Sequence, residues 1–272
     1  MPVRGNKKGK KKSSNNQTSQ PSQQPTTVPQ PRKKLQPTDT KPLVSIVTPT
    51  YNRRKFIPYA IKCFLHQTYP QDLMEWIVID DGTDPVGDLF EGMENVKYYR
   101  YEEKIKLGKK RNIMHEKCSG DIIVYFDDDD YYPPERVSSA VNRLRSSKTA
   151  IAAGSSRLLI YYNHIDKIYE FGPYGPNHAT AGTFALKKEV LKLTRYNDEA
   201  DMAEEKEFLK NYTIPFVQLH PEKTILVCSH NENTYDKKKL LNQGPHKFMR
   251  ETSIKVKNII KNKELRDFYT QQ

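Results

Sequence analysis

The sequence has few cysteines and no long apolar run. Its three cysteines, Cys63, Cys118 and Cys228, lie far apart and show no Cys-x-x-Cys spacing, so we expect reduced thiols that pack as small apolar side chains. No window reaches the roughly 18 consecutive apolar residues of a membrane-spanning helix. The polar N-terminus also lacks the apolar core of a signal peptide. These absences predict a cytoplasmic protein with no transmembrane segment.

The first 40 residues have almost no large apolar side chains. They consist largely of Lys, Gln, Ser, Thr, Asn and Pro, and such a composition cannot offset chain entropy by burial. We therefore expect residues 1–40 to form a disordered basic and polar tail. The remaining chain, from about Lys41, is long enough for one large or two small domains.

Positive charge is concentrated at the two ends of the chain. The net charge is +12; residues 1–40 contribute +8 and residues 236–272 contribute +6, which leaves −2 for residues 41–235. A Lys-rich tail can bind nucleic acid or anionic membrane, although it is more often a solubilising extension. We expect at most weak polyanion binding there, and we interpret residues 236–272 as a basic helical segment.

The most informative stretch is DIIVYFDDDDYYPP, residues 121–134. The apolar run Ile122–Phe126 predicts a buried strand, and it stops at four adjacent carboxylates, Asp127, Asp128, Asp129 and Asp130. In an extended chain, alternate members of this run would point the same way. One alternate pair could then hold Mg²⁺ or Mn²⁺, which prefer oxygen ligands. A solvated acidic turn is the alternative.

Strands and helices alternate in the first half of the folded part. We expect strands at 43–48, 74–79, 96–101 and 122–126, with helices at 56–64 and from 107. This order favours a mostly parallel α/β sheet. Polar clusters follow three of the strands, at 48–52, 80–81 and 127–130. In a parallel sheet these clusters would meet in one crevice.

The second half is less regular. We expect a helix after Pro134 and a hairpin that turns at Asn163 and His164. Further expected elements are a strand and then a helix in 179–191, a helix in 200–212, and short strands at 215–219 and 224–230.

Five strings in this order resemble the family 2 glycosyltransferases over residues 43–235: SIVTPTYNR, WIVIDDGT, LGKKRN, VYFDDDD and AEEKEF. The resemblance implies a glycosyltransferase A-type fold. This fold is a mostly parallel, Rossmann-like nucleotide-binding sheet with helices on both faces and a smaller mixed acceptor-side region. Residues 41–235 would form the catalytic domain, followed by the basic segment 236–272. A narrower likeness to glycosyltransferase-like proteins of large DNA viruses would imply a virion or the host cytoplasm.

The resemblance also implies a site for a UDP-sugar donor. Pro49, Thr50 and Tyr51 would line the uracil pocket, although an aromatic residue there can equally belong to the core. Asp81 would accept the imide hydrogen bond of uracil, and its alternative role is to form the turn before Gly82.

Arg111 would contact the nucleotide, and Lys109 is a weaker candidate. Lys110 stands where the family commonly has a small residue, so the sequence departs from the family pattern at this position of the helix. His178 and Gly182 would border the donor sugar.

The acidic run would hold Mn²⁺ or Mg²⁺ in an Asp-x-Asp motif. The resemblance places the metal on Asp129, with support from Asp127 or Asp128, directly or through the ribose. His230 would be a third metal ligand or a phosphate contact, and a structural role is the alternative. The metal would neutralise charge that builds on the departing diphosphate.

A carboxylate at the start of a helix would deprotonate the acceptor. Glu205 is the favoured base and Glu204 or Asp201 the alternatives, because relatives often have Asp where this chain has Glu. By composition alone, all three are ordinary solvated carboxylates.

Together these features predict a metal-dependent, inverting glycosyltransferase that moves a hexosyl or N-acetylhexosaminyl group from a UDP-sugar. The acceptor would be a hydroxyl of a glycan, a protein or a small molecule. One alternative is a non-catalytic, transferase-like module that docks on polyanions through its basic ends. A nucleotidyltransferase, which also uses paired aspartates, is the other.

Overall fold

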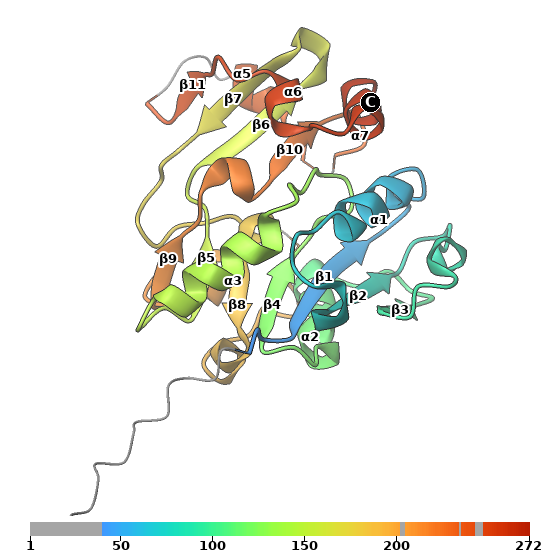
Figure 1. Ribbon diagram of the computed structural model, residues 1–272, viewed down its shortest axis with the longest axis vertical. Coiled ribbons are helices and arrows are strands. Elements are labelled where there is room, and N and C mark those ends of the chain that lie inside the picture. The colour runs from blue at the N-terminus through green and yellow to red at the C-terminus, as the bar shows by residue number, and fades with distance from the viewer. Residues whose placement is uncertain (1–39, 202–204, 234, 243–246) are drawn as a thin grey trace, which may run out of the picture. The chain divides into compact units, whose positions relative to one another are not determined.

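The computed structural model describes residues 40–201, 205–233, 235–242 and 247–272. Residues 41–272 form one compact unit, shown in Figure 1. The basic segment 236–272 therefore packs within the same unit as residues 41–235. Glu204 lies outside the described residues, as does almost all of the tail 1–40. Within the described part of the chain, no helix is both long enough and apolar enough to cross a bilayer.

The larger sheet has seven strands and is mostly parallel. Its order is β3 (Val96–Arg100), β2 (Met74–Asp80), β1 (Val44–Thr50), β4 (Ile122–Tyr125), β8 (Ala185–Lys187), β5 (Ala152–Gly154) and β9 (Phe216–Gln218). The strands β1, β2, β3 and β4 run parallel, and β8 is antiparallel to both of its neighbours. The strands β2 and β4 are buried along their whole length, as the apolar runs 76–79 and 122–125 within them predict.

Helices cover both faces of this sheet (Figure 1). The helices α1 (Ile57–Leu65) and α3 (Arg136–Ser146) pack in the core on one face, and α2 (Leu107–Lys117) packs in the core on the other. The buried residues of α1 include Ala60, Cys63 and Phe64, whose spacing matches one face of a helix. The fold class predicted from the sequence is therefore confirmed.

A second sheet has four strands, in the order β10 (Leu226–Ser229), β6 (Leu158–Tyr162), β7 (Lys167–Phe171) and β11 (Met249–Glu251). The strands β6 and β7 form the expected hairpin at Asn163 and His164. The apolar stretch before this hairpin differs from the expectation, because it divides between β5 in the large sheet and β6 in the small one. Ser155 and Ser156 separate the two strands, and the N–H of Ser155 donates to Oγ1 of Thr183 (3.0 Å).

The remaining elements are short. The helices are α4 (Glu205–Phe208), α5 (Lys238–Asn242), α6 (Val256–Ile259) and α7 (Lys263–Thr270). The 3-10 turns are η1 (Gln71–Leu73), η2 (Gly87–Phe90), η3 (Asn163–Ile165), η4 (Ala181–Thr183), η5 (Lys188–Lys192) and η6 (Pro221–Lys223).

Two expected helices are thus shorter than their sequences suggest. The segment after β8 is the 3-10 turn η5, and α4 ends at Phe208. Lys210, Asn211 and Tyr212 have φ of 50°, 55° and 62°, a left-handed conformation that cannot continue a right-handed helix.

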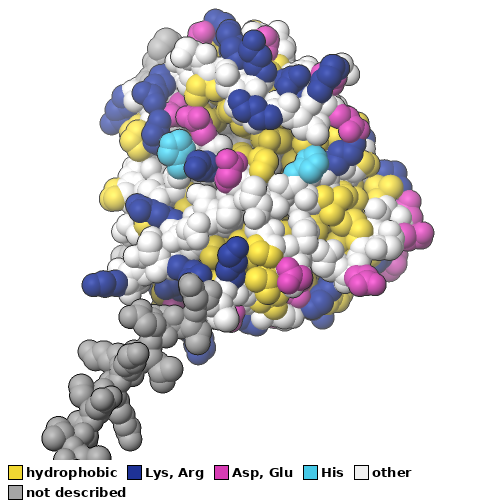
Figure 2. Space-filling view, in the orientation of Figure 1, with side chains coloured by type: hydrophobic (Ala, Val, Ile, Leu, Met, Phe, Trp, Pro, Cys, Tyr) yellow, Lys and Arg dark blue, Asp and Glu magenta, His cyan; other side chains and the backbone are white. Residues whose placement is uncertain are grey.

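The C-terminal segment is anchored in the core. The strand β11 pairs with β7, and Leu265 and Tyr269 of α7 are buried. The ring of Phe268 stacks on Tyr59 of α1 at 3.4 Å between centroids. Lys and Arg side chains gather at the top of Figure 2, over the region where Figure 1 shows α5, α6 and β11.

Candidate active site

The carboxyl ends of β1, β2 and β4 lie at the same edge of the large sheet. Thr50 pairs with Asp80, and Val47 pairs with Tyr125. The polar residues that follow these strands therefore meet at this edge, as is usual for ligand sites of open α/β sheets.

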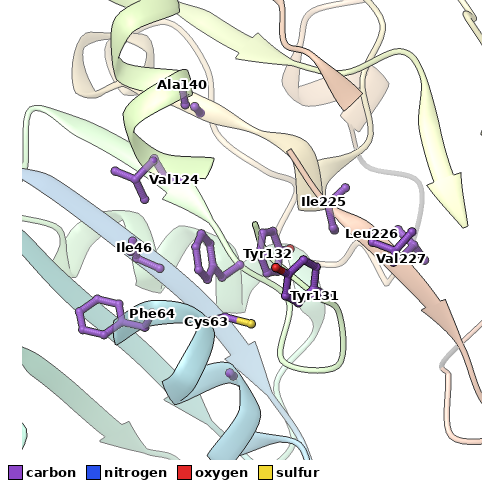
Figure 3. Close-up of a cluster of buried hydrophobic side chains, with 14 of the residues drawn as sticks. Ile46, Cys63, Phe64, Val124, Tyr131, Tyr132, Ala140, Ile225, Leu226 and Val227 are labelled. Carbon is purple, nitrogen blue, oxygen red and sulfur yellow. The ribbon is translucent and has the colours of Figure 1, made fainter. Parts of the chain in front are cut away.

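The four acidic residues form a bend rather than a continued strand. The strand β4 stops at Tyr125, and the N–H of Asp127 donates to the hydroxyl of Tyr132 (2.7 Å), which closes the bend. Tyr131 and Tyr132 are buried and, in Figure 3, point into the core between α1 and β10. The predicted alternation of side chains is wrong for this segment, because the chain turns here.

Each carboxylate in the bend has different neighbours. Asp130 points inward and accepts from the N–H of Cys228 (2.8 Å). Oδ2 of Asp129 lies 3.2 Å from Nε2 of His230 and 3.3 Å from Nδ2 of Asn233. Asp127 lies against Gly182, where an added Cβ would collide with Oδ2 of the aspartate. The structure thus brings Asp129 and His230 together, as predicted for the metal site.

Arg53 bridges the two central carboxylates. Its Nε lies 3.8 Å from both Oδ1 of Asp128 and Oδ2 of Asp129, and its NH2 donates to the carbonyl of Glu232 (2.6 Å). Arg53 belongs to the string SIVTPTYNR, but the sequence alone assigned it no role. Asn233 and Lys237 were not predicted as site residues either. The sequence feature that could have indicated them is their position shortly after His230.

Negative charge is in excess in the bend. Burial, followed by repulsion from Asp129, raises the pKa of Asp127 to about 6, against the attraction of Arg111. Burial also raises the pKa of Asp128 well above its ordinary value. Burial alone would raise the pKa of Asp129 too, but the contact with His230 and the charge of Lys237 lower it to about 2.

The donor set suits a hard divalent cation. Mg²⁺ and Mn²⁺ need only one or two protein carboxylates when phosphate oxygens and water supply the rest. The raised pKa values of Asp127 and Asp128 indicate that added positive charge would stabilise their ionised forms. Over the described ranges, however, no group of three or more His, Cys, Asp or Glu side chains is arranged to hold a metal by itself.

The predicted base pocket lies at the ends of β1 and β2. Tyr51 is partly exposed, and Nζ of Lys104 lies 4.5 Å from the centre of its ring. Tyr51 is therefore at the surface rather than in the core. Pro49 is also partly exposed, whereas Thr50 is buried.

Asp81 and Lys110 form a buried ion pair in this pocket. Nζ of Lys110 contacts Oδ1 of Asp81 and donates to the carbonyl of Thr50 (3.3 Å). Oδ2 of Asp81 accepts from the N–H of Ile105 (2.7 Å). Lys110, which departs from the family pattern, is therefore paired with Asp81, the carboxylate predicted to bind uracil. Burial nevertheless lowers the pKa of Lys110.

Arg111, the next residue of α2, is also buried. Its guanidinium carbon lies 5.8 Å from the ring centre of Tyr125 and 5.2 Å from that of Tyr196. Burial disfavours its charge, but Tyr196, Tyr125, Asp127 and Glu205 together raise its pKa. Arg111 is therefore within electrostatic range of Asp127, and its guanidinium is not presented at the surface.

Glu205 lies at the start of α4 and faces the turn η4. Its Oε1 accepts from the N–H of Ala181 (3.0 Å), and the next residue, Gly182, contacts Asp127. Burial lowers the pKa of His178, although the charge of Glu205 opposes this shift. Gly182 and Glu205 therefore border the acidic bend from one side, and His178 lies within electrostatic range of Glu205. Asp201, the other candidate base, is instead paired with Lys106.

Comparisons with known proteins agree with this arrangement. The fold is that of the glycosyltransferase A-type, nucleotide-binding enzymes. Residues 45–189 match the family model described as Glycosyl transferase family 2, and the chain belongs to this family. A Bacillus subtilis (strain 168) protein named as the teichuronic acid biosynthesis glycosyltransferase TuaG is 38% identical over 60 residues, which cover 22% of this chain and 23% of that protein.

Two solved structures share the fold at low sequence identity. The mannosyltransferase PcManGT from Pyrobaculum calidifontis, in complex with GDP-Man and Mn²⁺, has a TM-score of 0.58 and 17% identity, over 72% of this chain and 59% of that one. S. aureus TarS 1–349, in complex with UDP-GlcNAc, has a TM-score of 0.58 and 17% identity, over 84% of this chain and 70% of that one. This chain therefore spans about a quarter of its curated relative and somewhat more than half of the mannosyltransferase.

Proposed function

We propose that this protein is a metal-dependent, inverting glycosyltransferase that moves a sugar from a UDP-sugar to an acceptor hydroxyl. The observation that carries the proposal is the geometry around Gly182. The acidic bend contacts one side of η4 through Asp127, and Glu205 binds the same turn through Ala181. A group that stabilises the leaving diphosphate and a group that accepts the proton of the acceptor would thus border one space.

The donor would bind at the carboxyl edge of the sheet. Pro49, Thr50, Tyr51 and Asp81 would hold the uracil, and Asp128 the ribose. Arg111 would act on the diphosphate through the charge balance of the bend, and His178 would border the sugar. Family membership supports a nucleotide-sugar donor, and the bound UDP-GlcNAc of TarS supports a uridine donor and a hexosyl or N-acetylhexosaminyl group.

Asp127, Asp129 and His230 would hold Mn²⁺ or Mg²⁺. When bound, the cation would supply Lewis-acid stabilisation of the departing diphosphate. The bound Mn²⁺ of the mannosyltransferase supports this assignment. Arg53 would help to keep Asp129 ionised and in place before the donor binds, and its charge would oppose the effect of burial on Asp128.

The chemical step is one displacement at the anomeric carbon. Glu205 takes the proton of the acceptor hydroxyl while the oxygen of that hydroxyl forms the new bond to the anomeric carbon. The bond from that carbon to the diphosphate breaks, and UDP leaves with the electron pair. A single displacement inverts the configuration, and proximity and charge stabilisation together lower the barrier. Glu204 remains the alternative base.

The test uses the full-length protein with UDP-glucose, UDP-galactose, UDP-N-acetylglucosamine and GDP-mannose in the presence of Mn²⁺. We expect release of UDP from at least one uridine donor, and we expect EDTA to abolish it. Release that persists in EDTA would refute metal dependence, and release from GDP-mannose alone would refute a uridine donor. Absence of release from all four would favour the non-catalytic module.

Three narrower points stay predictions: a cytoplasmic location, weak polyanion binding by residues 1–40, and the likeness to viral proteins.

A further inference from the structure

A groove lies along α3, and its lining does not include the acidic bend. It has a volume of about 1020 Å³ and is bordered by α3, the residues that follow β5 and β9, and the loop 173–176. Ligand pockets usually measure about 300–1,000 Å³, so this groove is large enough for several linked small units. In Figure 1, α3 crosses the middle of the view. The same region of Figure 2 shows mainly uncharged polar and backbone atoms, with Lys and Arg side chains beside it.

The lining offers hydroxyl and amide groups together with one exposed aromatic ring. Ser139 and Ser146 contribute hydroxyls and Asn142 contributes an amide, all at positions that are at least partly exposed. Tyr174 is 42% exposed, and an aromatic ring pairs an apolar face with a polar edge. Many hydroxyls around an aromatic face suit a sugar chain, which is apolar on its ring faces and polar at its rim.

The lining also carries a surplus of positive charge. The charge of Arg157 is balanced by Glu170. Arg143 and Lys223 are both exposed, and in the described part of the chain neither has an ion-pair partner. Glu135 is the acidic side chain of the lining. Arginine binds carboxylate and phosphate groups in a bidentate manner, so the groove favours an anionic chain over a neutral one.

The groove wall is in contact with the segment that leads to η4. The ring of Tyr174 lies 5.0 Å from that of His178, and the N–H of Ser155 donates to Oγ1 of Thr183 (3.0 Å). Ala181, Gly182 and Thr183 are buried. These buried residues lie between Ser155 of the groove and Asp127 of the acidic bend, so the groove is a site of its own.

We propose that this groove binds a glycan chain that bears carboxylate or phosphate groups. Binding at this groove needs neither donor nor turnover. Failure of the groove can therefore be distinguished from failure of the transferase activity.

The test measures binding of an oligogalacturonide of about eight residues to the full-length protein by calorimetry, without donor. The groove variant is Arg143→Glu/Lys223→Glu. The matched control is Arg145→Glu/Lys192→Glu, which removes the same charge from exposed positions outside the groove lining, Arg145 on the same helix. Basic residues 1–40 are present in every protein, so any binding to them cancels in the comparison.

We expect the groove variant to bind at least tenfold more weakly than the control variant, and Tyr174→Ala to weaken binding as well. Equal weakening in the two charge variants would overturn the proposal, since it would indicate nonspecific attraction to basic surface. Equal affinity for the neutral maltooctaose would overturn the anionic preference, and equal affinity for inorganic polyphosphate would overturn recognition of a glycan. Absence of oligogalacturonide binding would show that the groove does not bind a glycan with carboxylate groups. A phosphorylated oligosaccharide would then be tested in the same way, and equal binding by the groove and control variants would overturn the proposal.

Discussion

Nε2 of His230 lies 3.2 Å from Oδ2 of Asp129. Nδ1 of the same ring accepts from the N–H of Glu232 (3.2 Å), and Nε2 also lies 2.7 Å from Nδ2 of Asn233. The histidine thus holds the one carboxylate of the bend whose pKa is lowered, to about 2. Asp129 is therefore the member of the bend that is ionised over the widest pH range.

Replacement of Asp129 by Asn should lower the rate of UDP release by about 10²–10³-fold, because a preorganised charge at the leaving group is lost. The measurement is release of UDP in saturating Mn²⁺. Asp130→Asn is the control, since the amide oxygen can still accept from Cys228. A similar loss in both variants would contradict a specific role for Asp129.

Replacement of Glu205 by Gln should lower kcat by about 10²–10⁴-fold, the usual contribution of a general base. The amide oxygen can still accept from Ala181, so the fold around η4 should remain and donor binding should change little. Glu207→Gln, an exposed position of the same helix, is the control. If Glu205→Gln kept full turnover, Glu204 would become the candidate base.

Gly182→Ala should disturb the bend without altering any charged residue. The added Cβ would collide with Oδ2 of Asp127 and lie 3.3 Å from Cδ1 of Ile225. We expect slower UDP release in the absence of acceptor, with far-ultraviolet circular dichroism unchanged. At Gly175 an added Cβ lies 3.8 Å from the nearest atom, so Gly175→Ala should release UDP at the normal rate. Normal release by Gly182→Ala would show that the bend tolerates movement of Asp127.

Asp81→Ala should destabilise the protein, because it leaves the ammonium of Lys110 buried without its carboxylate. Breaking a buried pair in this way costs about 3–5 kcal/mol. Asp81→Ala/Lys110→Met should recover most of this loss, since no uncompensated charge remains. Urea unfolding measures both effects. If the double variant were as unstable as Asp81→Ala, the ion pair would not be the source of the loss.

Asp127→Asn should change how stability depends on pH in the metal-free protein. The carboxyl pKa is raised in the folded protein to about 6 from 3.8, so the folded state binds more protons than the unfolded state between these values. Stability should therefore fall as the pH rises from about 4 to 6. The Asn variant should lack this part of the fall and be more stable at pH 7 by about 3 kcal/mol at most.

The measurement for Asp127 is urea unfolding in EDTA across this pH range. Asp72→Asn, at an exposed position, should follow the wild-type curve. A wild-type slope in Asp127→Asn would show that this carboxyl does not titrate as described.

The parallel half of the fold follows directly from sequence periodicity. The strands β1, β2 and β4 are almost wholly buried and rich in apolar residues, and the polar residues that end them meet because parallel strands share one edge. The second half was harder to predict. Ser155 and Ser156 look like a local interruption of one strand, but they are the point where the chain passes from one sheet to the other, and only pairing between distant strands decides this.

The candidate site shows the same division. The acidic run and Glu205 are visible as local motifs, and the structure places them near one another. Arg53 and Lys110 were not predicted as partners, because their roles depend on carboxylates that lie tens of residues away in sequence. The bend at Asp127 also escaped local rules, since it is closed by the hydroxyl of Tyr132, a residue that sequence patterns assign only to the core.

The hydroxyl of Tyr269 donates to the carbonyl of Asp130 (3.0 Å), so the last helix reaches the loop on which the aspartates lie. Proteolytic removal of α7 would take away this support and uncover the apolar surface around Cys63 and Tyr131. A shortened chain could therefore keep every proposed reactive group and still fail to hold the nucleotide. Fusion partners are accordingly better attached to the N-terminus when the enzyme is prepared for assay.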